Sequence, residues 1–396
     1  MKRNCLLLLT MVLVLTVSCT SKQQDENAWL RNGVSTSVQQ LKLMAEKVKS
    51  SGLQPRSIKN GEVRLENAYD WTSGFFPGSL WLAYELTGDS LLKNEAMHYT
   101  QLLSEIQYYK GTHDLGFMIH CSYGNAVRLS GNTSLDTVIV NGSESLISRF
   151  NPSVGQIRSW DFGEWRYPVI IDNMMNLEML FYASKISGDS TFRNIAIRHA
   201  DVTMKNHFRG DYSSYHVVSY NPETGAVESQ GTFQGYSDSS AWARGQAWGL
   251  YGYTMCYKET GDAKYLNQAK AIASFIMNNA NSTSDLIPYW DYNAPNIPNA
   301  PRDASAAAVT ASALLSLSTM VADGAAYFDY AETILKNLSS DKYLAKVGEN
   351  KNFILMHSVG HLPANSEIDV PLNYADYYYL EGLIRYAALK QINIIH

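Results

Sequence analysis

TGDSLL, residues 87–92, recurs along the chain in close copies, and the fold can be predicted from it. Each copy carries a glycine where a helix would end, and glycine readily adopts the left-handed backbone found there. The Asp, Asn, Ser or Thr beside the glycine can cap the next helix. We therefore interpret each copy as the bend of a helical hairpin. The bends are predicted at Gly88, Gly131, Gly188, Gly261 and, in a looser copy, Gly324.

The segments after the bends are amphipathic, which is typical of helices packed on a core. Leu92, Ala96, Tyr99 and Leu103, for example, fall on one helical face. Irregular spacing of the hairpins favours an all-α toroid of six closed hairpins, an (α/α)6 barrel, over an open solenoid with more uniform repeats. Helices are expected near residues 28–50, 74–87, 91–109, 115–130, 134–149, 172–187, 190–207, 240–260, 263–280, 304–322, 326–340 and 374–390.

Short strand signals interrupt the helices. Residues 212–220 are rich in Tyr, Ser and Val, and a turn sequence, NPETG, follows at 221–225. This pattern predicts a small β-hairpin within a loop. In a ring of hairpins, the short bends lie on one rim and the long connections lie on the other. The long connections are expected at 150–171, 208–239, 281–303 and 341–373, and functional groups gather on such loops.

The N-terminus has the pattern of an export signal. Lys2 and Arg3 precede an apolar run, residues 6–17, that is too short to span a bilayer. A small residue followed by Cys19 is typical of a bacterial lipoprotein signal, although Thr16 stands where leucine is usual. We predict a signal peptide over 1–19 with lipidation at Cys19, a flexible tether over 20–29 and one folded domain over 30–396. The protein would then be a periplasmic or outer-membrane lipoprotein that touches the membrane only through its lipid; ordinary secretion is the alternative.

Composition narrows the classes of partner and cofactor. The chain has 396 residues, a net charge of −5 and no basic stripe, so no nucleic-acid partner is predicted. Cys121 and Cys256 stand in apolar helical segments and are expected to be buried free thiols. The sequence has neither zinc-ligand spacing nor a phosphate-binding loop, so no metal or organic cofactor is expected. The 26 Tyr and 8 Trp favour sugar stacking in an exported protein, although most rings will form core.

Asp172 is the first candidate catalytic residue. It lies in RSWDFGEWRYPVIIDNMMNLEML, residues 158–180, after an apolar run and before a helical pattern. An ordinary role in capping the helix is one interpretation. Three aromatic residues, Trp160, Trp165 and Tyr167, precede it with two arginines between them. Aromatic and basic groups around a carboxylate at a helix start suit an acidic carbohydrate.

Asp114 is the second candidate. It stands beside His113 in KGTHDLGFMIHCSYG, residues 110–124, again at the start of a helical run. The two aspartates are 172 − 114 = 58 residues apart, which fits two helix starts separated by one hairpin. Both follow long connections, so both are expected on the same rim. There they would form the carboxyl pair that many sugar hydrolases use, although any chain of this size contains many Asp pairs.

A third group lies in QGYSDSSAWARGQAWGLYGY, residues 234–253. Arg244 and Trp248 share one helical face at positions i and i+4. A guanidinium beside an indole can hold a carboxylate while the ring stacks on a sugar, and the alternative is an arginine packed on tryptophan for structure alone. His216 stands in a strand-like stretch, where a lone histidine is more often structural than catalytic, and His357 and His361 are equally ambiguous.

Five motifs occur in the order found in glycoside hydrolase family 88, the unsaturated glucuronyl hydrolases, and the chain resembles that family over essentially its whole mature length. They are WTSGFFPGSLWLAYELTGD at Trp71, THDLGFM at Thr112, IIDNMMNLEML at Ile170, WARGQAWGLYG at Trp242 and DVPLNYADYYYLEGL at Asp369. The resemblance implies an (α/α)6 catalytic domain. It also implies removal of a 4,5-unsaturated uronic acid from the non-reducing end of oligosaccharides that lyases release from chondroitin, hyaluronan or heparin.

The resemblance also implies roles for single residues. By motif, Asp172 corresponds to the family's general acid/base and Asp114 to its second essential aspartate. Family members are understood to hydrate the C4=C5 vinyl ether rather than attack C1. Positions that resemble the family's substrate contacts are Trp71, His113, Trp160, His216, Gln234, Arg244, Trp248 and Tyr374; loop lengths vary around Trp160 and Tyr374.

Other functions stay open from the sequence. An unsaturated rhamnogalacturonyl hydrolase would share the barrel and the chemistry but act on pectin fragments. An ordinary inverting glycosidase would share the fold. A surface glycan-binding lipoprotein would use the aromatic residues without catalysis, but the two intact aspartate motifs argue against it. The preferred glycosaminoglycan and the oligomeric state also stay open at this point.

Overall fold

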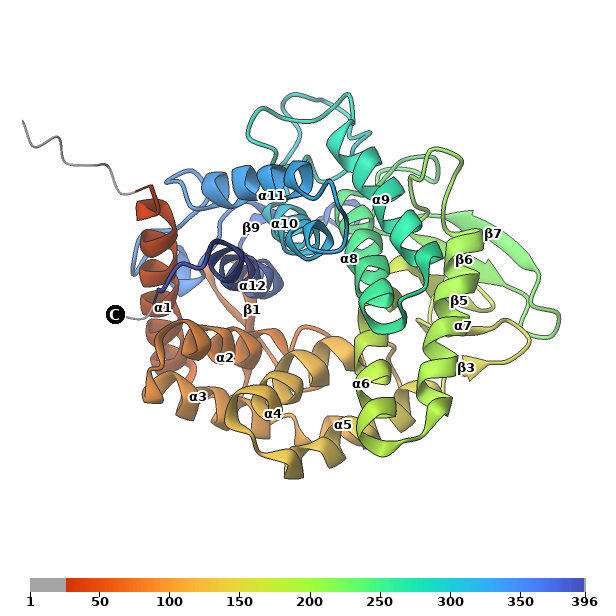
Figure 1. Ribbon diagram of the computed structural model, residues 1–396, viewed down its shortest axis with the longest axis horizontal. Helices are drawn as coiled ribbons and strands as arrows, with labels where there is room; N and C mark the ends of the chain where they lie inside the picture. Colours follow the sequence, from red (N-terminus) through yellow and green to blue (C-terminus); the bar gives the residue numbers. More distant parts are fainter. Residues whose placement is uncertain (1–25, 395–396) are drawn as a thin grey trace, which may run out of the picture.

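The computed structural model describes residues 26–394, and its helices form a closed ring (Figure 1). Successive inner segments pack against one another around the ring, and the last, α12, packs against the first, α2. The predicted (α/α)6 barrel is therefore confirmed. The inner segments are α2 (Phe75–Thr87), the π-helical η2 (Gly116–Gly124) with α4 (Asn125–Ser130), α6 (Leu177–Ser187), α8 (Ala243–Thr260), α10 (Ala304–Ser318) and α12 (Asn373–Lys390). The outer helices are α1 (Ala28–Val48), α3 (Ser90–Gln101), α5 (Asp136–Ile147), α7 (Ser190–Asn206), α9 (Ala263–Met277) and α11 (Ala325–Leu338).

Inner and outer helices differ in how much of their surface is buried. Outer helix α9 buries one face, with Tyr265, Ala269 and Ile272 against the core. Inner helix α10 is buried on nearly every side, and its alanine-rich sequence lets α8, α11 and α12 pack against it. Burial from both sides explains why amphipathic spacing identifies the outer helices more clearly than the inner ones.

Four of the five predicted bends have the expected backbone. Gly88, Gly131, Gly188 and Gly261 follow their helices with φ between 69° and 76°, the left-handed region that favours glycine. The prediction for Gly324 is wrong, because its φ is −64° and it precedes α11 rather than ending α10. Glycine is needed there for another reason: a Cβ atom would lie 1.9 Å from the Ser318 carbonyl oxygen.

Polar residues after the bends cap the next helices, as predicted. The side chains of Asp89, Asp189 and Asp262 each accept a hydrogen bond from a backbone N–H two residues later. Asn132 does the same at the start of the short 3-10 helix η3 (Thr133–Leu135). Such a cap stabilises the helix that follows it, so the bend motif stabilises both helices of its hairpin.

Small antiparallel sheets lie in the long connections. The predicted hairpin is present as β6 (Val217–Tyr220) and β7 (Val227–Gly231), and β5 (Pro168–Ile170) adds a third strand beside β6. The other strands are β1 (Gln54–Lys59), β2 (Glu62–Glu66), β3 (Phe150–Asn151), β4 (Gln156–Ile157), β8 (Ser358–His361) and β9 (Ser366–Val370). Further 3-10 segments are η1 (Ser104–Tyr108), η4 (Ile171–Asn176), η5 (Asn350–Asn352) and η6 (Leu362–Ala364).

The predicted signal peptide, Cys19 and residues 20–25 of the predicted tether lie outside the described residues. Helix α1 begins at Ala28, so residues 28 and 29 belong to the barrel and not to the tether. Within 26–394, no helix combines the length and the apolarity that a membrane crossing requires. Cys121 and Cys256 are buried free thiols, as the sequence predicted.

Candidate active site

A cavity of about 660 Å³ opens among the long connections of the barrel. It is the place where most of the predicted site residues meet. Seven of the ten line it: Trp71, His113, Asp114, Trp160, Asp172, Gln234 and Tyr374. The other three, His216, Arg244 and Trp248, are buried behind its wall.

Both carboxylates stand where a connection enters an inner helix, but in turns that are not α-helical. Asp172 lies in the 3-10 segment η4, directly after β5, and Ile170 rather than Asp172 is the capping position. The capping interpretation of Asp172 is therefore wrong. Asp114 precedes the π-helical η2, and its Oδ2 accepts a hydrogen bond from the Thr112 hydroxyl at 3.1 Å. Such irregular turns are frequent at functional sites.

The two carboxyls have unusual acidity. Burial raises the pKa of Asp114 to about 7, and the nearby Asp70 carboxylate adds to the increase. Burial also raises the pKa of Asp172 to about 7, although the Arg244 cation opposes the increase and Asp114 adds to it. Groups with such values can hold and release a proton near neutral pH, which general acid–base catalysis requires.

A buried histidine accompanies each carboxyl. His113 Nε2 lies 3.2 Å from Asp114 Oδ1, and burial lowers the pKa of His113 to about 3. His216 Nε2 lies 3.6 Å from Asp172 Oδ2, and burial lowers the pKa of His216 well below its ordinary value. Both rings are therefore neutral near pH 7. His361 also lines the cavity, whereas His357 is exposed and pairs with Asp369.

Several buried polar atoms at this place have no hydrogen-bond partner within the described residues. They are His113 Nε2, Asp172 Oδ2, His216 Nε2 and Trp248 Nε1. The Trp248 indole N–H also helps to lower the pKa of Asp172, so it lies near the Asp172 carboxyl. Unpaired buried polar atoms are rare in proteins and call for an explanation. A polar ligand in the cavity would supply the missing partners.

Arg244 does not contact the cavity as the sequence suggested. Its guanidinium is only 1% exposed and donates to Asp303 at 2.9 Å and to the Gly360 carbonyl at 2.6 Å. It lies over the ring of Trp242, at 4.4 Å, and not over Trp248. Arg244 thus forms a buried ion pair and holds the β8–β9 hairpin, and its predicted contact with a substrate carboxylate stays a prediction.

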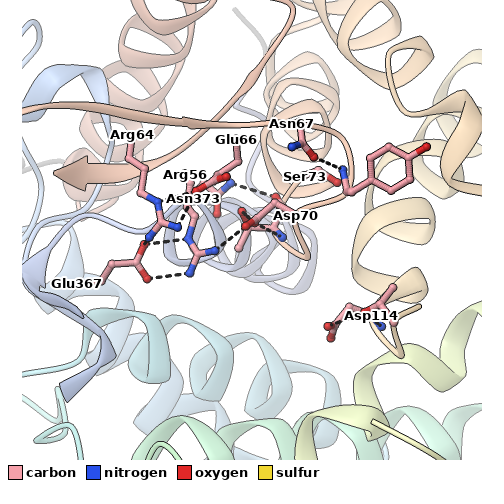
Figure 2. Close-up of polar contacts among 12 residues, drawn as sticks. Arg56, Arg64, Glu66, Asn67, Asp70, Ser73, Asp114, Glu367 and Asn373 are labelled. Carbon is pink, nitrogen blue, oxygen red and sulfur yellow. Dashed lines mark hydrogen bonds and ion pairs between the residues drawn. The ribbon is translucent and has the colours of Figure 1, made fainter. Parts of the chain in front are cut away.

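An ion network at one side of the cavity was missed by the sequence analysis. Arg56 binds both oxygens of Glu367, at 2.8 and 2.9 Å, and reaches Asp70 at 2.7 Å. Arg64 joins Glu367 from the next strand, at 3.1 Å (Figure 2). Glu367 has a left-handed φ of 54°, and its carboxylate passes so close to Gly360 that a Cβ there would clash. Glycine at 360 is therefore required by the network.

Aromatic rings also line the cavity. Trp160 stacks on Phe162 with ring centroids 5.1 Å apart, and Phe233 meets Trp160 edge-on at 5.1 Å. Phe162 is 55% exposed and Phe233 is 37% exposed, which is unusual for apolar rings lining a cavity. Trp71 and Tyr374 form a second ring pair, 5.0 Å apart. These faces suit the apolar faces of sugar rings.

Among residues 26–394, no group of three or more His, Cys, Asp or Glu side chains is arranged to hold a metal ion. The side chains at the site offer two carboxyls of raised pKa, two neutral histidines, one indole N–H and a set of aromatic faces.

Comparison with known proteins gives a consistent family. An unsaturated glucuronyl hydrolase of Formosa agariphila is 50% identical over 319 residues, 80% of each chain. An unsaturated chondroitin disaccharide hydrolase of Streptococcus agalactiae is 32% identical, over 84% of this chain and 85% of that one. A crystal structure of an unsaturated glucuronyl hydrolase specific for heparin has a TM-score of 0.92 at 56% identity, covering 93% of this chain and 100% of the other. No family model matches the chain.

Proposed function

The chain belongs to the unsaturated glucuronyl hydrolases, glycoside hydrolases of family 88, and we propose that it acts on lyase-generated glycosaminoglycan fragments. It would remove the 4,5-unsaturated glucuronic acid at their non-reducing end. The observation that carries the proposal is the buried pair Asp114 and Asp172, both with a pKa of about 7, in a cavity walled by aromatic rings. The similar structure that is specific for heparin makes a heparin-type disaccharide the first substrate to test.

We infer that the reaction is hydration of the C4=C5 vinyl ether. A carboxyl of the pair protonates C4, and the positive charge that develops at C5 is stabilised by the ring oxygen. Water then adds to C5 while a carboxylate takes its proton. The resulting hemiketal opens and expels the aglycone. The raised pKa values of Asp114 and Asp172 support this route, because the carboxyl pair must both give and accept a proton near neutral pH.

The hydration route predicts where isotopes enter the product. An ordinary glycosidase adds water at C1 and has no need of a double bond. We expect no turnover of the saturated glucuronide, deuterium at C4 after reaction in heavy water, and labelled oxygen at C5 after reaction in labelled water. Mass spectrometry and NMR of the product would measure all three. Labelled oxygen at C1, or comparable cleavage of the saturated analogue, would exclude the hydration mechanism while leaving a glycosidase function.

Two alternatives remain testable with the same assay. An unsaturated rhamnogalacturonyl hydrolase would prefer pectin-derived fragments, and a glycan-binding protein would leave every disaccharide intact. These outcomes can be separated with a panel of unsaturated heparin, chondroitin, hyaluronan and rhamnogalacturonan disaccharides. Turnover of each disaccharide is measured as the loss of the ultraviolet absorbance of its conjugated double bond. Asp172→Asn serves as the matched inactive control, because an amide fills the same space but cannot cycle a proton.

We also propose that the protein is an exported lipoprotein anchored through Cys19. The support is the apolar run at 6–17 followed by a small residue and this cysteine. Stable anchoring takes two or more acyl chains, which a lipoprotein cysteine carries. We expect the wild type in the membrane fraction and Cys19→Ala in soluble fractions, as measured by fractionation and mass spectrometry of the mature N-terminus. A soluble wild type that begins at another residue would contradict the anchor.

A further inference from the structure

The arginines that line the cavity are already engaged by carboxylates of the chain. Among the described residues of the lining, the basic side chains other than histidine are Arg56 and Arg64. Arg56 contacts Glu367 through Nε and Nη2, and it contacts Asp70 through Nη1. Arg64 contacts Glu66 through Nε and Nη2, both at 2.6 Å, and Glu367 through Nη1. All three nitrogens of each guanidinium are therefore occupied by carboxylate oxygens.

Other basic groups near the cavity are neutral or lie behind an acidic side chain. Burial lowers the pKa of His113 to about 3 and also lowers the pKa of His361, so both rings are neutral near pH 7. Arg149 and Arg158 lie outside the lining, and they contact Asp161, which belongs to it, at 2.9 and 3.4 Å. At this place as well, a carboxylate faces the cavity and its cations stand behind it.

Glu367 is the centre of the ion network and is fixed in place. Its side chain is 5% exposed, and its two oxygens accept from three N–H groups of the two arginines. Its backbone has a left-handed φ of 54°, which is uncommon for a residue other than glycine. A Cβ atom on residue 360 would lie 2.4 Å from Glu367 Oε2, so the glycine there leaves room for this carboxylate. Backbone strain of this kind is typical of functional sites.

The ion network and the carboxyl pair occupy different parts of the same cavity. Under the proposed function, the unsaturated sugar lies against Asp114 and Asp172, where the unpartnered polar atoms gather. Figure 2 shows Glu367 and the two arginines apart from Asp114, although all of them line the cavity. The aglycone sugar is therefore the part of the substrate that meets the network.

We propose that Glu367 is a specificity-determining residue that selects fragments whose aglycone sugar carries no anionic substituent, and this inference rests on the proposed function. The amino group of a heparin-type aglycone is either acetylated, and then neutral, or sulfated, and then negative. A sulfate at this place would meet carboxylates, because the arginine nitrogens are occupied. Like charges repel strongly in a partly buried site, and such repulsion is an effective way to reject one of two similar ligands.

Two unsaturated heparin-type disaccharides that differ only in an N-acetyl or an N-sulfate group test the proposal. We expect the wild-type kcat/KM to be at least about tenfold higher for the N-acetylated one, and Glu367→Gln, which keeps the size but removes the charge, to reduce this preference at least about fivefold. Asp161→Asn should act in the same direction with a smaller effect, because Asp161 is 52% exposed. Glu223→Gln removes a charge from an exposed pair with Arg166 and is the matched control, with an unchanged preference. A wild type without preference, or a preference that Glu367→Gln leaves unchanged, would overturn the proposal.

Two further measurements do not depend on the folding of Glu367→Gln. Salt screens repulsion, so raising the salt concentration from about 0.05 to 0.5 M should reduce the wild-type preference for the N-acetylated disaccharide, and a preference that grows with salt would overturn the proposal. Calorimetry with Asp172→Asn measures the binding of both disaccharides without turnover, and we expect the N-acetylated one to bind more tightly. Equal affinities would overturn the specificity alone, whereas binding of neither disaccharide would refute the proposed function itself.

Discussion

Replacing Arg244 with methionine tests whether this residue is a structural anchor of the cavity wall. Methionine has a similar length and no charge, so it fills the space but leaves Asp303 buried without its cation. Arg244 and Asp303 are 1% and 0% exposed. Breaking a buried pair by removing one partner destabilises by about 3–5 kcal/mol. The Val359 carbonyl also loses its donor, which adds about 1–3 kcal/mol, whereas the Gly360 carbonyl keeps the Gln234 amide as a donor.

This loss converts into a measurable change in melting temperature. With an unfolding entropy of about 2.1 cal/mol/K per residue, a folded part of roughly 370 residues loses about 1.3 °C for each kcal/mol. We therefore expect Arg244→Met to melt about 5–10 °C lower than wild type, as measured by calorimetry or by a thermal shift assay. The exposed pair of Arg166 and Glu223 gives a matched control: Arg166→Met should leave the melting temperature close to that of wild type, because solvent screens the pair.

A second variant separates lost charge pairing from lost packing. Asp303 caps α10 by accepting from the Ser305 N–H, and asparagine retains that oxygen without the charge. Asp303→Asn in the Arg244→Met background should therefore recover part of the lost stability. Because Arg244 also lowers the pKa of Asp172, the acidic limb of the activity profile should move to higher pH in Arg244→Met. A melting temperature within about 2 °C of wild type would refute the anchoring role.

Asp172→Asn should fold and lose about 10²–10⁴-fold in kcat, the usual contribution of a general acid–base group; normal turnover in a folded variant would contradict the assignment. The folded pKa of about 7 lies above the ordinary 3.8, so the folded state holds an extra proton between these values and wild-type stability should fall as pH rises through them. Asp172→Asn should flatten this dependence in thermal scans from about pH 4 to 8, and an unchanged slope would argue against the raised pKa. Trp160→Ala should raise KM about 3–10-fold through lost stacking, and steady-state kinetics with an unchanged KM would remove this ring from the substrate contacts.

The sequence predicted those features that depend on neighbouring residues. A helical bend needs a left-handed residue and a cap within a few positions, so Gly88 and Asp89 could be identified directly. The prediction of a bend at Gly324 was wrong, because glycine is needed there for its close approach to Ser318 and not for a left-handed turn. The inner helix starts at the site could be placed, but their 3-10 and π-helical turns have no comparable local signal.

Contacts between distant residues could not be predicted in this way. Arg56 and Glu367 are 311 positions apart, and only closure of the ring brings β1 against β9. Arg244 offered a plausible local partner in Trp248, yet its charge is neutralised by Asp303, 59 positions away. Helical spacing shows which residues share a face, but it does not show what the barrel places in front of that face.

The same side chains that hold the cavity together also set its chemistry. Arg244 anchors the β8–β9 hairpin through backbone carbonyls and at the same time lowers the pKa of Asp172. Asp70 binds Arg56 in the ion network and also raises the pKa of Asp114, which lines the same cavity (Figure 2). A cation behind one carboxyl and an anion near the other make the two sites unequal although burial raises both. Changes in the wall should therefore alter acid–base function even where they never touch substrate.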